Sequence, residues 1–250
     1  MKGLTDGMKS NFNRKINYNS PQTKQKLSLS SPYGLKPVNS SKRSGTIASI
    51  PNSEQSLRNC VQEKASQGNY AVAISLLDRL IALYPDNAAD YNNRGLMYFR
   101  NNQIIEALGD LTQALAINPR LDSAYNNRAN CYAAQGELSN AIADYDLALD
   151  LNPANLRAWI NQGITFRELK LYDLALENFE ITLIIGDALE ERIYSERGRT
   201  YHLRGDWNCA VGDYQKALEI LAAKPKLATY RQKVRGWLNQ LLAPLTIADD

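Results

Sequence analysis

The stretch that decides the fold is residues 122–155, DSAYNNRANCYAAQGELSNAIADYDLALDLNPAN. Its apolar residues recur at spacings of three and four, which indicates amphipathic helices. The turn residues Gln135, Gly136 and Glu137 separate two such helices. Pro153 falls where the second helix must stop, because proline lacks the backbone donor that would continue the helix. The block therefore predicts two helices joined by a tight turn.

Four further copies of this pattern flank that block. The five blocks are 54–87, 88–121, 122–155, 156–189 and 191–224, with one residue inserted before the last. The twentieth position holds alanine in every block, as Ala73, Ala107, Ala141, Ala175 and Ala210. The eighth position holds Val61, Gly95, Ala129, Gly163 and Gly198. Mostly small residues at these two positions let the paired helices approach closely.

The order of residues in a block is an aromatic residue, glycine and tyrosine, then alanine and a second aromatic residue, then proline. This order resembles the tetratricopeptide repeat (TPR) family. The resemblance implies an all-α fold, a right-handed α-solenoid in which stacked helix pairs supply the core for one another. We expect a disordered basic tail over 1–52, five TPR repeats over 53–224, a capping helix over 225–243 and a C-terminal tail over 244–250. Between the last two repeats, Asp187 and Glu190 predict a helix-starting capping box.

Two positions of the block change together. Position 7 on the first helix and position 23 on the second are arginine and aspartate in three blocks: Arg94 with Asp110, Arg128 with Asp144, and Arg197 with Asp213. The fourth block has Gln162 with Asn178, and the first has Cys60 with Leu76. Because an unpaired buried charge is costly, the joint change indicates that the two residues touch. These residues are predicted to be structural and not catalytic.

In the TPR fold, several positions of the first helix line a concave groove, the usual ligand site. Carried onto this sequence, the resemblance predicts a peptide-binding groove lined by Asn59, Asn92, Asn93, Arg100, Asn126, Asn127, Asn130, Arg157, Asn161, Arg167, Arg192, Arg199 and His202. An asparagine carboxamide both donates and accepts, so a column of asparagines can pair with the backbone of an extended peptide. The alternative is that asparagine is simply common at this position of TPR repeats.

The charge of the predicted groove opposes that of the repeats around it. Six arginines, including Arg58, map to groove positions against Glu168 and Glu196, whereas residues 51–250 hold 25 acidic and 20 basic residues. A basic groove suits an acidic or carboxylate-bearing peptide. A co-chaperone clamp for a C-terminal carboxylate fits poorly, because Asn126 stands where the clamp has lysine and Glu196 where it has a basic residue.

The first fifty residues contain nine basic residues and one acid and are rich in serine and asparagine. Their apolar residues show no helix or strand period, so the segment is predicted to be disordered. It could be a linker, an arm that contacts a partner, nucleic acid or an anionic surface, or an organelle transit peptide. We expect a cytoplasmic protein, and the plastid stroma is the alternative if the tail is a transit peptide.

Several classes of function find little support. A single histidine, His202, argues against histidine-based catalysis, and the three widely spaced cysteines against a zinc or disulfide framework. We expect no enzyme activity, no cofactor, no metal and no small-molecule substrate. No apolar run approaches the roughly 20 residues that span a bilayer, so an integral membrane protein is not expected. The cysteines and the three tryptophans fall at helix-packing positions and are predicted to be core residues.

The preferred hypothesis is a scaffold or adaptor that holds an extended, acidic segment of a partner protein. The sequence Tyr-Asn-Asn-Arg-Gly at 91–95 resembles TPR proteins of cyanobacteria and plastids, some of which assist assembly of photosynthetic complexes, which implies an assembly factor. The alternative is binding of nucleic acid or an anionic surface through the basic tail, with the repeats as a platform. Few aromatic residues in the tail make nucleic acid the less favoured partner. The sequence leaves the oligomeric state open.

Overall fold

The computed structural model describes residues 53–246, which contain eleven α-helices, one short 3-10 helix and no strand. The predicted all-α class is confirmed. The tail predicted over 1–52 lies outside the described residues, as do residues 247–250. The chain divides into two compact units, Met1–Pro85 and Asp86–Asp250.

The first unit contributes one helix pair, α2 (Glu54–Ser66) and α3 (Tyr70–Leu83). The side chain of Ser53 caps α2 by accepting a hydrogen bond from the Ser56 amide. Leu57 on α2 and Ala73, Leu77 and Leu80 on α3 are almost fully buried. The pair thus packs through one apolar stripe on each helix.

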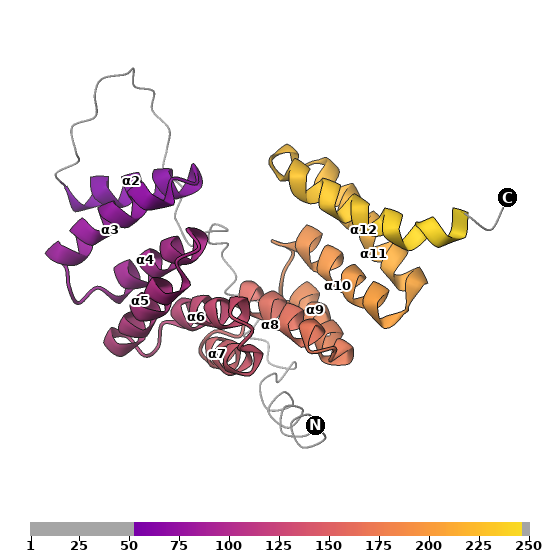
Figure 1. Ribbon diagram of the computed structural model, residues 1–250, viewed down its shortest axis with the longest axis horizontal. Helices are drawn as coiled ribbons and strands as arrows, with labels where there is room; N and C mark the ends of the chain where they lie inside the picture. Colours follow the sequence, from indigo (N-terminus) through magenta and orange to yellow (C-terminus); the bar gives the residue numbers. More distant parts are fainter. Residues whose placement is uncertain (1–52, 247–250) are drawn as a thin grey trace. The chain divides into compact units, whose positions relative to one another are not determined.

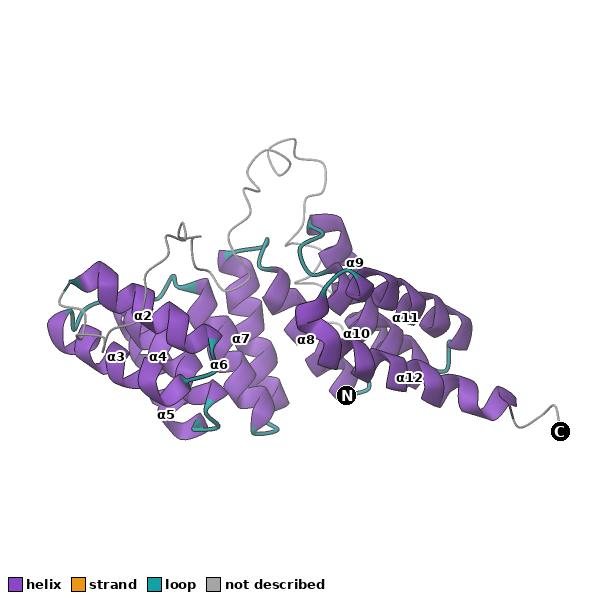
Figure 2. Cartoon of the chain, turned by 90° about the horizontal axis from the view of Figure 1, so that it is seen from above, coloured by secondary structure: helices purple, strands orange, loops and turns teal. Residues whose placement is uncertain are grey.

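The second unit stacks four helix pairs and one further helix. The pairs are α4 (Ala88–Arg100) with α5 (Ile104–Ile117), α6 (Asp122–Ala134) with α7 (Leu138–Leu151), α8 (Leu156–Glu168) with α9 (Tyr172–Ile185), and α10 (Glu190–Arg204) with α11 (Trp207–Ala222). A short 3-10 helix, η2 (Pro225–Leu227), leads into α12 (Ala228–Thr246). Figure 1 shows these pairs following one another, and Figure 2 shows short loops between the helices. We call α4, α6, α8 and α10 the first helices of their pairs.

Close packing within a pair depends on the small residue of the first helix. A Cβ atom added to Gly95 would lie 2.8 Å from Cγ of Leu111, and one on Gly198 would lie 3.0 Å from the ring of Tyr214. Real Cβ atoms essentially never approach another heavy atom below 3.0 Å, so a larger residue at Gly95 would displace Leu111. Glycine is therefore part of the packing between the two helices.

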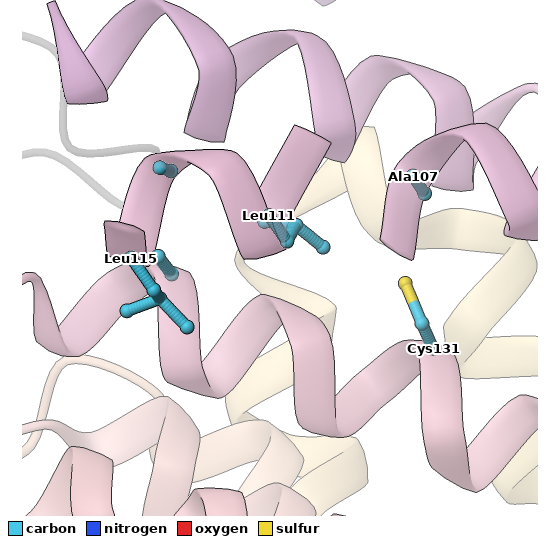
Figure 3. Close-up of a cluster of buried hydrophobic side chains, with 6 residues drawn as sticks. Ala107, Leu111, Leu115 and Cys131 are labelled. Carbon is cyan, nitrogen blue, oxygen red and sulfur yellow. The ribbon is translucent and has the colours of Figure 1, made fainter. Parts of the chain in front are cut away.

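Successive pairs bury a shared core. One cluster joins Ala107, Leu111 and Leu115 of α5 to Ala124 and Cys131 of α6. In Figure 3, the thiol of Cys131 points from α6 toward Ala107 of the preceding pair. Burial raises the pKa of this thiol to about 12, so Cys131 stays neutral and packs as a small apolar side chain.

The turn inside each pair uses the left-handed backbone region at one equivalent position. Gly68, Gly136 and Gly205 have φ angles of 76°, 80° and 99°, and Asn102 and Lys170 occupy the same place with φ of 62° and 61°. Glycine adopts this region without a steric penalty, whereas lysine does not. The five turns therefore share one geometry but differ in backbone strain.

The helix after the fourth pair begins differently from the prediction. The N-cap of α10 is Leu189, and no side chain caps this helix end. Asp187 contributes only its backbone carbonyl, which accepts from the Glu190 amide at 3.2 Å. The predicted capping box of Asp187 and Glu190 is thus wrong. Asp187 could cap a helix that begins at residue 188, but α10 begins two residues later, at Glu190.

At the end of the second unit, α12 covers α11. Val234 and Leu241 are buried against Ala210, Tyr214 and Leu221 of α11. The opposite side of α12 carries exposed polar residues, among them Gln232, Arg235 and Asn239. The helix α12 therefore caps the stack, because its apolar side covers α11 and its polar side faces solvent.

Candidate functional site

A chain of side-chain hydrogen bonds links the first helices of the second unit. Arg192 on α10 donates to Oδ1 of Asn161 on α8 at 2.9 Å, and Asn161 donates to Oδ1 of Asn126 on α6 at 3.2 Å. Asn126 donates to its neighbour Asn127 at 3.3 Å, and Asn127 donates to Oδ1 of Asn92 on α4 at 2.9 Å. We call these five residues the amide ladder. The bonds between helices are all donated toward the N-terminal end.

The amide ladder changes the role of two predicted groove residues. Asn92 and Asn126 were expected to face a ligand, but their side chains are only 7% and 6% exposed. Both lie between successive helices and accept hydrogen bonds from the next pair. They stabilise the stacking of the pairs, because a buried amide without a partner would cost about 1–3 kcal/mol.

The remaining predicted asparagines keep part of their surface. Asn93, Asn127, Asn130 and Asn161 are each partly exposed. Oδ1 of Asn130 accepts a hydrogen bond from the Tyr145 hydroxyl at 2.7 Å, so the two amide hydrogens of Asn130 remain as donors. Asn59 belongs to the first unit, where its Oδ1 accepts from Gln55 within α2 at 3.0 Å.

The asparagine-to-asparagine bonds of the ladder end at α8, and Arg192 of α10 supplies the next donor. The position that holds Asn92 and Asn126 in the earlier pairs holds the buried Ile160 in α8. Glu196 of α10 instead accepts from the guanidinium of Arg167 at 2.7 Å, and the Tyr230 hydroxyl of α12 lies 3.5 Å from its other oxygen. Arg167 is thus neutralised, and it adds less positive charge to the face than the sequence predicted.

The three arginine–aspartate contacts are bidentate ion pairs inside their repeats. Nε and one Nη of each arginine donate to the two carboxylate oxygens of its partner, at 2.7–2.9 Å. The pairs are Arg94 with Asp110, Arg128 with Asp144 and Arg197 with Asp213. In the fourth helix pair, Asn178 donates to Gln162 at 3.0 Å in the same place. Each position-7 residue of these four repeats therefore has its partner on the second helix.

The aspartates of these pairs are closed to a ligand. Asp110, Asp144 and Asp213 are buried, with exposed fractions of 8%, 5% and 7%. The hydrogen bonds to Asp144 and Asp213 raise the pKa of Arg128 and Arg197. Asp110 and the other two carboxylates thus belong to the packing between the two helices of a repeat.

Aromatic rings and cations gather where α10 meets α12. The guanidinium carbon of Arg199 lies 5.6 Å from the centre of the Trp237 ring, and Nζ of Lys233 lies 5.0 Å from the same centre. Nδ1 of His202 lies 3.4 Å from an Arg199 nitrogen and 3.3 Å from the Tyr214 hydroxyl. Burial, and then the charge of Arg199, lower the pKa of His202. We call Arg199, His202, Lys233 and Trp237 the terminal cluster.

The carboxylate clamp of co-chaperones finds no counterpart in these residues. Asn126 is buried in the ladder, Asn161 accepts from Arg192, and Glu196 is a buried carboxylate paired with Arg167. A carboxylate ligand at this window would meet the like charge of Glu196. These residues therefore do not form the cationic clamp that a C-terminal carboxylate requires.

Several side chains differ from the sequence prediction. Trp159 is buried and its indole donates to the Pro153 carbonyl at 2.9 Å, but Trp207 is 49% exposed and Cys209 is exposed. Both lie in the first turn of α11, ahead of the buried Ala210. The prediction of a core role for these two residues is wrong, because they lie on the side of α11 that faces solvent.

Sequence reasoning missed two contributors from the last helix. The contacts of Tyr230 with Glu196 and of Trp237 with Arg199, both on α10, were not predicted from the sequence. Lys224, just before α12, forms an ion pair with the buried Glu191 at 2.7 Å. A capping helix was predicted over 225–243, but the contacts of α12 with α10 depend on the angle at which α12 packs.

Two other kinds of feature are absent from the described part of the chain. Within residues 53–246, no group of histidine, cysteine, aspartate or glutamate side chains is arranged to hold a metal ion. Over the same residues, no helix combines the length and the apolar character that crossing a membrane requires.

The stacked helix pairs place this protein among the α-solenoids. Proteins of this class generally act in protein interactions. Two family models, both described as tetratricopeptide repeat, match residues 61–122 and 123–155. The chain is a tetratricopeptide repeat protein. No curated protein gives a significant match to its sequence.

Solved structures share the fold at low sequence identity. A thermophilic TPR protein of Thermus thermophilus is 20% identical, with a TM-score of 0.65 over 73% of this chain and 98% of its own. MamA is 23% identical, with a TM-score of 0.55 over 66% of this chain and 96% of its own. The Cut9–Hcn1 APC/C hetero-tetramer gives 20% identity and a TM-score of 0.67, over 80% of this chain and 38% of the matched chain. These identities support the fold alone.

Proposed function

We propose that this TPR protein is a non-catalytic scaffold that holds an extended, acidic segment of a partner protein along the first helices of its second unit. TPR repeats are in general interaction modules, which supports the scaffold role. The observation that carries the proposal is the polarity of this face. Its partly exposed groups are mainly hydrogen-bond donors and cations, so a complementary ligand supplies acceptors and negative charge.

The donors come from specific residues. The oxygen of Asn130 accepts from the Tyr145 hydroxyl, and the described part of the chain offers its amide hydrogens no acceptor, so both remain as donors. Arg100 is exposed at the end of α4, and Arg157, Arg192 and Arg199 are partly exposed on α8 and α10. Backbone carbonyls and carboxylates of an extended peptide are the acceptors that such donors bind best. Assembly of a larger complex, including one of the photosynthetic type, would be one use of this face.

Site-directed photo-crosslinking tests which face binds. A photoreactive residue replaces the exposed Arg100 or Glu168 at the ends of first helices, and, as matched controls, the exposed Glu180 or Glu219 on second helices. We expect the full-length protein to crosslink one partner from positions 100 and 168 in native lysate at high salt. Equal crosslinking from positions 180 and 219 would contradict the proposal.

The alternative through the basic tail makes a different prediction. Binding that is retained at high salt by a chain lacking residues 1–50 supports the repeats as the binding surface. Binding only at low salt, and only with those residues present, would place the activity in the basic segment, because phosphate contacts weaken steeply with salt.

A further inference from the structure

Cations that stack on aromatic rings fall into two groups in this protein. Arg94, Arg128 and Arg197 lie over tyrosine rings, and each is neutralised by the aspartate of its own repeat. Arg199 and Lys233 lie over Trp237, and within residues 53–246 neither forms an ion pair with a carboxylate. The terminal cluster thus holds two positive charges that the described protein leaves without a countercharge.

We propose that Arg199, Lys233 and Trp237 form a subsite that binds a carboxylate side chain of the partner segment. The assignment rests on the proposed function, since it gives that segment an acidic residue at the end that reaches α12. Lys233 is exposed and Arg199 is partly exposed, so both cations are open to an incoming ligand. Contact with the Trp237 ring restrains each cation before a ligand arrives, which lowers the entropic cost of binding.

The surroundings of this subsite favour an anion. Lys226, Arg231 and Arg235 also belong to the η2–α12 segment, and no acidic residue occurs between Glu219 and Asp249. Glu196, a buried carboxylate on the same helix as Arg199, is already paired with Arg167. The field at this end of the stack is therefore positive, and it attracts a negatively charged segment before contact.

His202 offers a direct report on the subsite because it is the only histidine in the chain. It lies 3.4 Å from an Arg199 nitrogen, whose positive charge helps to hold the histidine pKa below its ordinary value. A carboxylate bound to Arg199 offsets part of that charge and raises the His202 pKa. A nuclear magnetic resonance titration of the single histidine ring then measures occupancy of this place and no other.

The experiment follows the His202 ring signal of the full-length protein against pH, with and without an acetylated, amidated oligoglutamate peptide. A labelled copy of the same peptide gives the total affinity by fluorescence anisotropy. We expect the peptide to raise the His202 pKa, and we expect the double variant Arg199→Gln/Lys233→Gln to lose that rise with roughly tenfold weaker affinity, the equivalent of one lost charge-assisted contact. The control Arg120→Gln/Lys216→Gln removes the same charge from exposed positions elsewhere and should keep both signals.

Each contrary result has a distinct meaning. Tight peptide binding with no change at His202 would overturn the subsite while leaving the proposed function standing. Equal losses in the test and control variants would show non-specific attraction and overturn the subsite. Absence of any peptide binding would overturn both proposals. Tighter binding of a single-stranded oligonucleotide than of the peptide, lost in the same double variant, would replace the peptide with nucleic acid as the ligand.

Discussion

Between α4 and α8 the first helices are joined by neutral amides. From α8 to α12 the helices are joined instead by arginine side chains, a carboxylate, a tyrosine hydroxyl and stacked rings. The same position that donates as Asn127 and Asn161 in the earlier pairs becomes the carboxylate Glu196 in α10. One backbone arrangement therefore accepts two chemistries at its helix junctions. The amide part should respond little to salt and pH, and the ionic part should respond to both.

The largest effect should come from breaking the ionic junction. Glu196→Ala leaves the guanidinium of Arg167, which is only 13% exposed, without its carboxylate and removes a partner of Tyr230. Removing one member of a buried pair costs about 3–5 kcal/mol, so we expect a clear fall in the free energy of unfolding measured by urea denaturation.

The double variant Arg167→Met/Glu196→Leu separates charge burial from loss of structure. It should recover most of the stability lost in Glu196→Ala, because no unpaired charge remains. If the single and double variants are equally destabilised, the ion pair is not the main source of the effect.

A smaller loss is expected in the amide part. Asn126→Leu removes the acceptor of Asn161 and the donor to Asn127, at a cost of about 1–3 kcal/mol. Asn93→Leu is the matched control on the neighbouring first helix, since the described part of the chain gives Asn93 no side-chain hydrogen bond. Equal melting temperatures for the two variants would show that the ladder does not stabilise the stack.

Substitutions at two equivalent turns should change the stability in opposite directions. Lys170 between α8 and α9 holds the left-handed conformation that Gly136 holds between α6 and α7. Lys170→Gly should raise the free energy of unfolding by up to about 1 kcal/mol, because the strain of a side chain there exceeds the added chain entropy of glycine. Gly136→Lys should lower it by a similar amount, and thermal unfolding of both variants measures the two signs.

Much of the fold could be predicted because repetition makes weak signals add. The 34-residue spacing recurs in five blocks, and the arginine–aspartate spacing recurs in three and is replaced jointly in the others. That spacing was enough to predict Asp110 as the partner of Arg94, and Asp110 is buried, as the argument from an unpaired buried charge assumed. Cys131 was a favourable case, since its helix position alone predicted its burial. Trp207 was predicted to be buried but is exposed. Which side of α11 is covered depends on how the neighbouring helices pack, and the helix position alone does not reveal this.

The polar face was harder to predict than the core. Successive residues of a helix point about 100° apart, so neighbouring asparagines such as Asn126 and Asn127 face different surroundings. The 35-residue separation of Asn92 from Asn127 and of Asn126 from Asn161 was a usable signal, since it joins adjacent positions of successive blocks. The pair of Arg167 with Glu196 occurs once, so no repetition within the sequence could have revealed it.

The smallest predicted effect is a pH dependence at the ionic end. Burial and Arg199 lower the pKa of His202, so the folded protein binds fewer protons there than the unfolded chain does in weak acid. The free energy of unfolding should therefore fall as the pH drops from about 6.5 through the lowered pKa, and it should be unaffected by this group above that range. The groups that face His202 are Arg199 on its own helix and Tyr214 on α11.

The variant His202→Gln isolates this contribution. It keeps a polar side chain near Arg199 but cannot gain a proton, so its loss of stability on acidification from about pH 7.5 to about pH 5.5 should be smaller than that of the natural protein. Asn126→Leu, altered in the amide part, should keep the full natural pH dependence because it leaves His202 and its neighbours in place. If His202→Gln loses as much stability on acidification as the natural protein, the acid sensitivity lies in other groups, and His202 is not the source of the contrast between the two ends.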